Sequence, residues 1–153
     1  MLPNPDWKEF FESLNSNRVE YVVVGALALA FHGYPRYTGD VDILIRQEQA
    51  NAERVVAALV AFGFGSVGVT AEDLMAERAV IQLGYPPVRI DLLTSVSGVS
   101  FEDVWRGRVA GDFDGVPVHY IGRPELLRNK QAAGRPKDLG DAAELIRREL
   151  KGL

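Results

Sequence analysis

The chain has 153 residues, of which 47% are hydrophobic and 25% are charged, a composition typical of a folded globular domain. The absence of cysteine excludes disulfide scaffolds, zinc–thiolate sites and thiol nucleophiles. A net charge of −4 argues against a broad nucleic-acid binder, and the sequence shows neither a secretory signal nor an apolar run of membrane-spanning length. We therefore expect a cytoplasmic protein with a single domain, residues 1–153.

The first part of the sequence predicts helices and strands in alternation. Apolar spacing indicates a helix that begins at Pro5, a buried strand at 20–24, a short helix at 26–32, a second strand at 40–45 and a helix at 48–62. Gly25 ends the first strand in a tight turn. A helix of about one crossover length separates the two strands, which favours a parallel pair.

The second part predicts two hairpins and two C-terminal helices. We expect a short edge strand at 64–69, a helical turn at 71–76, strands at 79–84 and 88–93, a helix at 101–106, a hairpin at 108–121, and helices at 123–133 and 136–150. The predicted fold class is therefore α/β, a mixed β-sheet of about five strands with helices packed on it. Residues 19–119 would form the core and residues 120–153 a C-terminal helical segment.

Two aspartates interrupt the second strand. Asp40 and Asp42 are one residue apart, so their side chains lie on the same face, about 6.6 Å apart along the chain. Two carboxylates this close repel each other unless they share a cation, and hard oxygen ligands of this kind suit Mg²⁺. The alternative is a strand end that is simply exposed to solvent.

A third aspartate, Asp91, interrupts the apolar strand at 88–93. If that strand lies beside residues 40–45, Asp91 can join the pair and complete a two-cation site suited to in-line phosphoryl transfer. The alternative is that Asp91 marks a strand end or pairs with Arg89, whose side chain we expect on the opposite face.

The turn at Gly25 and the charge distribution both suggest a phosphate-binding site. A strand that ends in glycine and opens a helix presents backbone N–H groups and a positive dipole end. Residues 120–153 carry 8 Lys/Arg against 5 Asp/Glu, whereas the remainder of the chain is acidic. A basic segment could face phosphates beside an acidic metal-binding region, or it could be a solvated helix face.

Together these features resemble the polymerase-β-like nucleotidyltransferase superfamily, in which a strand, a glycine-containing turn and a helix precede a D-x-D strand and a later third aspartate. The stretch VGALALAFHG, followed by Arg36, Thr38, Asp40 and Asp42, is most similar to a small bacterial branch that includes the AbiEii-like toxins of abortive-infection toxin–antitoxin pairs. That branch also carries a C-terminal lysine and an R-x-K-D-x-x-D segment, which Lys130 and residues 135–141 match.

The resemblance implies a nucleotidyltransferase fold with C-terminal helices and a metal-dependent transfer of NMP from an NTP, such as ATP, to an acceptor hydroxyl. The implied acceptors are an RNA 3′ end (tRNA), a protein or a small molecule, and an antitoxin protein is an implied partner. Mg²⁺ or Mn²⁺ would bind the implied catalytic residues, Asp40, Asp42 and Asp91. The implied nucleotide-binding residues are Gly25, Ala26, Arg36, Thr38, Lys130, Lys137 and Asp138.

Several alternatives stay open. Superfamily members usually have Gly, Ser or Thr after the first glycine, whereas Ala26 offers only its N–H, which favours a weak or inactive nucleotidyltransferase-like binding module. A metal-dependent glycosyltransferase is disfavoured by the short segment before Asp40. Arg36 could contact phosphate or pair with an acid, and Asp138 could line the cleft or merely favour the helix dipole. We expect His32 to be a structural residue.

Overall fold

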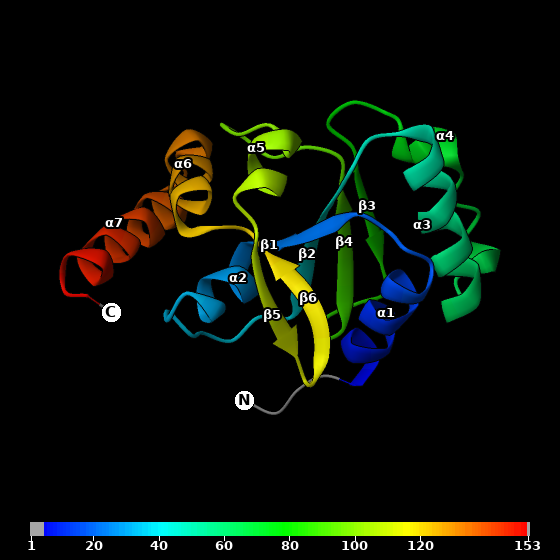
Figure 1. Cartoon of the computed structure of the whole chain (residues 1–153), viewed down its shortest axis with the longest axis horizontal. Coiled ribbons are helices and arrows are strands. Elements are labelled where there is room, and N and C mark those ends of the chain that lie inside the picture. Colours follow the sequence, from blue (N-terminus) through cyan, green and yellow to red (C-terminus); the bar gives the residue numbers. More distant parts are fainter. Residues whose placement is uncertain (1–4, 153) are drawn as a thin grey trace.

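The computed structural model describes residues 5–152, with residues 1–4 and 153 outside the described part, and it has a mixed α/β fold (Figure 1). This fold class confirms the prediction, with six strands rather than about five. The sheet order is β3-β4-β2-β1-β6-β5. The strands are β1 (Tyr21–Val24), β2 (Asp40–Ile45), β3 (Val80–Leu83), β4 (Arg89–Leu93), β5 (Val109–Phe113) and β6 (Val116–Tyr120).

The helices lie to both sides of this sheet. In Figure 1, α1 and α3 lie on one side of the molecule and α6 and α7 on the other. The helices are α1 (Pro5–Ser16), α2 (Gly25–Phe31), α3 (Gln49–Phe62), α4 (Ala71–Leu74), α5 (Phe101–Arg106), α6 (Arg123–Ala133) and α7 (Pro136–Leu150). Among residues 5–152, no helix has the length and apolar character needed to cross a bilayer.

The prediction of a strand at 64–69 was wrong. This segment contains a short 3₁₀ helix, η1 (Gly65–Val67). Gly63 and Gly68 flank it with φ of 107° and 80°, in the left-handed region. Because a strand needs an extended backbone, these two glycines leave too short a segment between them for a strand of six residues.

The prediction of a parallel pair at 20–24 and 40–45 was also wrong. β1 and β2 are antiparallel, with Val24 opposite Asp42. A parallel connection must return along the whole strand, but α2 has only seven residues, about 10 Å of helix. The chain therefore leaves β1 and enters β2 at the same end of the sheet. The two later hairpins, β3–β4 and β5–β6, are antiparallel as predicted.

A different pair of strands, β2 and β4, is parallel, and its register places Asp42 opposite Asp91. The face of β2 away from these acids carries Val41 and Ile43, which are fully buried. On that side, Phe10 of α1 makes an edge-to-face contact with Phe62 of α3, with 5.2 Å between the ring centroids. The apolar core thus holds β2 from one face while its other face presents carboxylates.

Candidate metal and nucleotide site

The three acids predicted from two strands lie together. Asp40 and Asp42 come from β2 and Asp91 from β4, and one carboxylate oxygen of each lies within 4.8 Å of the other two. Asp91 is buried, whereas Asp40 and Asp42 are half-buried. Because all three are hard oxygen donors on one face of the sheet, they form a donor set that fits Mg²⁺ or Mn²⁺. We call these three residues the acidic trio.

The electrostatics of the acidic trio also favour a cation. Burial, followed by the negative charges of Asp40 and Asp91, raises the pKa of the Asp42 carboxyl to about 7, against the opposing effect of Lys130. A carboxylate that holds its proton near neutrality lacks sufficient positive charge around it. A divalent ion bound to all three carboxylates would supply that charge.

Arg89 lies on the same face as the acidic trio, so the expectation that it points to the opposite face was wrong. Residues two apart on a strand share a face, and Arg89 precedes Asp91 by two positions. Its Nη2 donates to Asp40 Oδ2 at 2.6 Å and to Asp91 Oδ2 at 3.1 Å. Its Nε is 3.1 Å from Asp91 Oδ1 but is poorly aligned for a hydrogen bond. The guanidinium therefore neutralises part of the charge of these two acids.

Gly25 is required at the turn for two reasons. Its φ is +69°, a conformation that residues with a Cβ rarely adopt, and a Cβ built on it would be 2.3 Å from Asp42 Oδ2. The bend and the acidic trio are therefore in direct contact. Gly25 and Ala26 line the same cleft as the three carboxylates, which places the backbone at the start of α2 beside them.

A network of charges on α6 and α7 forms the opposite wall. Lys130 is buried, with its Nζ 3.4 Å from Asp138 Oδ1 and 3.1 Å from Asp141 Oδ2. Arg36 donates two hydrogen bonds to Asp141, at 2.7 and 3.0 Å, and Arg135 donates to Asp138 at 2.6 Å. The last contact is the main reason that the pKa of Asp138 is lowered.

These contacts bear on two alternatives that the sequence left open. Arg36 pairs with an acid, Asp141, and its contact with phosphate stays a prediction. Asp138 and Asp141 are 1% and 2% exposed and bind cations, so their role goes beyond a favourable interaction with the helix dipole. The two acids position basic groups at the cleft, which is a role that spacing alone could not assign.

A cleft of about 530 Å³ brings together the ten site residues predicted from the sequence. The residues are Gly25, Ala26, Arg36, Thr38, Asp40, Asp42, Asp91, Lys130, Lys137 and Asp138. The hydroxyl of Thr38 is 2.8 Å from the backbone oxygen of Asp40 and 3.1 Å from its carboxylate, so it helps to hold the start of β2.

Sequence reasoning missed other residues of the cleft. Tyr37, Ser97 and Asn129 also line it, and none of them stands in a recognisable motif. The position of Arg89 could have been found, because the alternation of faces along a strand already places it with Asp91. His32 has the structural role that we expected, with Nε2 hydrogen-bonded to the Ile121 carbonyl at 2.7 Å.

Comparisons with known proteins support the fold. No family model and no curated protein matches this chain. The fold is similar to the crystal structure of a "putative nucleotidyltransferase" from Thermotoga maritima, with a TM-score of 0.56 and 16% sequence identity. The similarity covers 99% of this chain and 97% of that chain. The chain therefore has the fold of that protein, in agreement with the nucleotidyltransferase fold expected from the sequence.

The shifted pKa of Asp42 predicts a pH-dependent stability. The folded state retains the proton of Asp42 up to about pH 7, whereas the unfolded chain releases it near the ordinary value of 3.8. Stability from this group is therefore complete below pH 3.8 and decreases as the pH rises to about 7. In metal-free buffer, Asp42→Asn should stabilise the protein by about 1–3 kcal/mol at pH 8 and change it little at pH 4.

Urea unfolding of both proteins at the two pH values measures this difference. Asp114→Asn is the matched control, because Asp114 is exposed in the β5–β6 turn and asparagine tolerates its positive φ. An equal gain in the control would show a general effect of net charge. A loss of stability in Asp42→Asn at pH 8 would contradict the electrostatic account of the acidic trio.

The contact between the bend and Asp42 predicts that Gly25→Ala destabilises more than backbone strain alone. The left-handed φ costs about 1–2 kcal/mol, and the steric conflict with the Asp42 carboxylate adds to this. Gly68→Ala is the matched control, because its φ of +80° is close to that of Gly25 and a Cβ there meets nothing within 4 Å. The difference between the two losses in chemical unfolding measures the clash.

The same comparison in an Asp42→Ala background provides a second check. Removing the carboxylate leaves only the Cβ of residue 42, at 3.1 Å from the new methyl group, so most of the extra loss at Gly25 should disappear while the loss at Gly68 stays the same. Additive losses at Gly25 and Asp42 would show that the two residues do not press on each other.

Proposed function

We propose that the protein is a metal-dependent nucleotidyltransferase that moves NMP from an NTP to an acceptor hydroxyl. The observation that carries this proposal is the convergence of three carboxylates beside the Gly25 bend, in a cleft whose opposite wall is basic. Polyphosphate needs positive charge, and catalysis at an α-phosphate needs a site for divalent ions. The similarity of the fold to the Thermotoga maritima protein supports the same reaction class.

The residues of the cleft have complementary roles in this reaction. Asp40, Asp42 and Asp91 would hold Mg²⁺ or Mn²⁺, which supplies charge neutralisation at the attacking and leaving oxygens. The N–H groups of Gly25 and Ala26 would donate to phosphate oxygens. Positive charge from α6 and α7 would attract the triphosphate, and the pairing of Lys130 with two buried acids fixes its position.

The transfer forms one bond and breaks one. The acceptor oxygen bonds to the α-phosphorus, and the bond from that phosphorus to the bridging oxygen of pyrophosphate breaks, with its electron pair leaving on pyrophosphate. Asp91, the most buried member of the acidic trio, would accept the proton of the acceptor hydroxyl. Catalysis would rest mainly on positioning and charge neutralisation.

The resemblance of VGALALAFHG and of the C-terminal R-x-K-D-x-x-D segment to abortive-infection toxins supports a finer proposal. The protein would act in the cytoplasm as the toxin of a toxin–antitoxin pair, with a neutralising antitoxin as its partner. The second candidate is a catalytically inactive binding module, which is favoured by Ala26, since it offers no side-chain contact to phosphate.

Transfer from a labelled NTP distinguishes these candidates. With Mg²⁺ or Mn²⁺ and a bacterial lysate as the source of acceptors, the wild type should label a product, and Asp40→Asn and Asp91→Asn should each lower the rate by about 100-fold or more. Asp114→Asn, which lies outside the cleft, should keep the full rate. Tight binding of metal and NTP with no labelled product would favour the binding module.

The pairing of Arg89 with the acidic trio predicts a competition with metal ions. Because the guanidinium contacts Asp40 and Asp91, Arg89→Gln should free these carboxylates and lower the Kd for Mn²⁺ about three- to tenfold. Calorimetric titration with Mn²⁺ alone measures this change. Arg106→Gln is the control, because it removes the same charge from a side chain that is 78% exposed on α5. Weaker Mn²⁺ binding in Arg89→Gln would mean that Arg89 positions the carboxylates instead.

A further inference from the structure

A second hollow, of about 810 Å³, adjoins the nucleotide cleft. Ser97 lines both. Along β4 and the segment after it, Leu93 lines the cleft and Ser95 lines the second hollow. The neighbouring strand β3 is divided in the same way. Val80, at its start, lines the cleft, and Arg78, two residues before it, lines the second hollow. The two spaces are therefore consecutive parts of one trough, and we call the second part the acceptor hollow.

The boundary between the two parts is firmly held. Asn129 of α6 donates to the Ser97 carbonyl at 2.9 Å. One residue later, a Cβ on Gly98 would be 2.4 Å from the Ala132 Cβ and 3.0 Å from the Arg128 carbonyl oxygen. The segment after β4 thus packs directly on α6, at a distance that only glycine permits.

The far wall of the acceptor hollow is also fixed by hydrogen bonds. The side-chain amide of Gln47 donates to the Ala76 carbonyl at 2.8 Å, and the Thr94 hydroxyl lies 2.9 Å from the same oxygen. Thr94 in turn accepts from the Ala79 N–H at 2.8 Å. These contacts hold the segment before β3. Because Gln47 uses its side-chain nitrogen for the contact with Ala76, its side-chain oxygen is left as an acceptor at the wall of the hollow.

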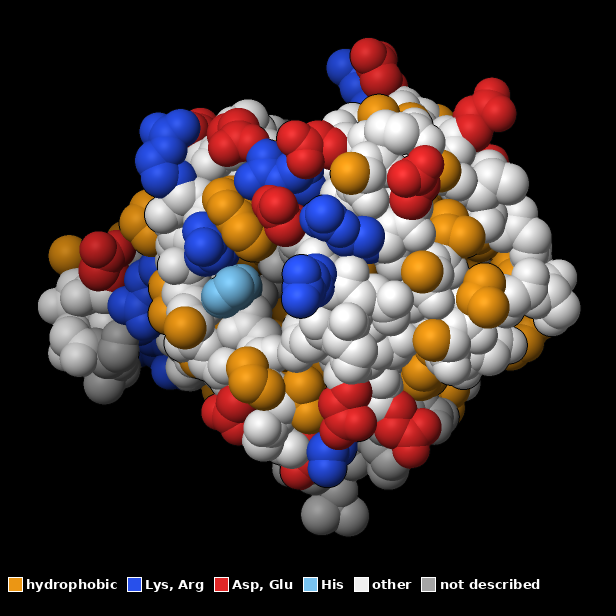
Figure 2. Space-filling model, turned by 45° about the vertical axis from the view of Figure 1, so that its right-hand side comes forward, with side chains coloured by type: hydrophobic (Ala, Val, Ile, Leu, Met, Phe, Trp, Pro, Cys, Tyr) orange, Lys and Arg blue, Asp and Glu red, His pale blue; other side chains and the backbone are white. Residues whose placement is uncertain are grey.

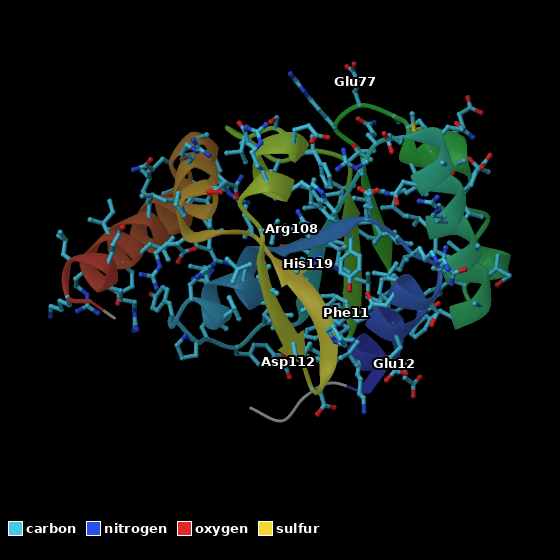
Figure 3. The ribbon with its side chains drawn as sticks, in the orientation of Figure 1. Phe11, Glu12, Glu77, Arg108, Asp112 and His119 are labelled. Carbon is cyan, nitrogen blue, oxygen red and sulfur yellow. The ribbon has the colours of Figure 1, made fainter. Side chains whose placement is uncertain are left out.

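The charges of the acceptor hollow do not suit a polyanion. Glu77 and Arg78 are its charged lining residues within the described part of the chain, so the lining carries one charge of each sign. Glu77 projects from the segment between α4 and β3 at the top of Figure 3, and α4 carries Glu72 and Asp73. Figure 2 shows basic and acidic side chains interspersed on the face that it displays. RNA binding would require a surplus of Lys and Arg along the path of the phosphates.

We propose that the acceptor hollow binds the acceptor of the transfer, and that this acceptor is a small, polar, hydroxyl-bearing molecule without net negative charge. The proposal rests on the proposed function. Serine hydroxyls, the Gln47 amide and a pair of opposite charges match such a molecule, and the volume lies in the range of small-molecule sites.

The geometry also explains how the acceptor reaches the acidic trio. Asp91 and Leu93 lie on the same face of β4, about 6.6 Å apart, and Ser97 borders both spaces. A molecule held in the hollow can extend its hydroxyl past Leu93 to Asp91. Its oxygen then bonds to the α-phosphorus, its proton passes to the Asp91 carboxylate and on to water, and pyrophosphate leaves with the electron pair of the broken bond.

The absence of cysteine allows a direct test. Ser95→Cys introduces a single thiol at the exposed lining of the hollow, and fluorescein maleimide then fills the space. The matched control is Ser66→Cys, modified in the same way, because Ser66 is exposed on η1 and lines neither space. We expect the modified Ser95→Cys protein to bind MgATP as well as the unmodified one and to lose about tenfold or more of its transfer rate. The modified control should keep both.

The acceptor is supplied as two fractions of one bacterial lysate, the small-molecule ultrafiltrate and the purified RNA. Labelled product should form with the ultrafiltrate. Product with RNA alone would overturn the acceptor class and leave the proposed function intact. Protection of the introduced thiol from maleimide by MgATP would show that the hollow holds the nucleotide, which overturns the proposal. Product with the unfractionated lysate but with neither fraction would also overturn the acceptor class alone. A wild type that binds none of the four NTPs with Mg²⁺, or that labels nothing in the unfractionated lysate, would overturn the proposed function itself.

Discussion

The repulsion among Asp40, Asp42 and Asp91 is the constraint on which the rest of the site depends. Their oxygens lie within 4.8 Å of one another at a partly buried position, where a carboxylate without compensating charge is costly. The protein compensates with Arg89 from the same sheet and with positive charge from α6, and yet burial and the neighbouring acids raise the pKa of Asp42 to about 7. The fold thus neutralises the three acids only in part, and the negative charge that remains favours the binding of a divalent ion.

The charge network of the C-terminal helices solves the opposite problem. Burying the ammonium group of Lys130 without acids beside it would destabilise the chain, and Asp138 and Asp141 supply those acids. The same acids also bind Arg135 and Arg36, so each one positions two cations. The cleft therefore has a wall that is rich in negative charge on the sheet and a wall of positioned cations on α6 and α7, and metal with polyphosphate matches both.

The sequence predicted which acids lie together better than it predicted the topology of the sheet. Alternation along a strand puts Asp40 and Asp42 on one face whatever the partner strand, so this part of the prediction was independent of the sheet order. The direction of β1 against β2 depends on where the chain re-enters the sheet after α2, and apolar spacing contains no information about that. Likewise, the pairing of Asp138 with Lys130 and of Asp141 with Arg36 requires the packing of α6 and α7 against each other and against the loop after α2.

Stability alone does not account for this arrangement. Buried ion pairs can often be replaced by apolar residues of similar size with no loss of stability, so stability does not require an ion-pair network at this helix interface. The acidic trio also costs stability, because the pKa of Asp42 is raised to about 7 and because its carboxylate leaves room only for glycine at position 25. The acidic trio and the Gly25 bend are thus both costly to folding, and they lie in direct contact in the cleft that adjoins the acceptor hollow. Binding and catalysis explain this arrangement better than folding does.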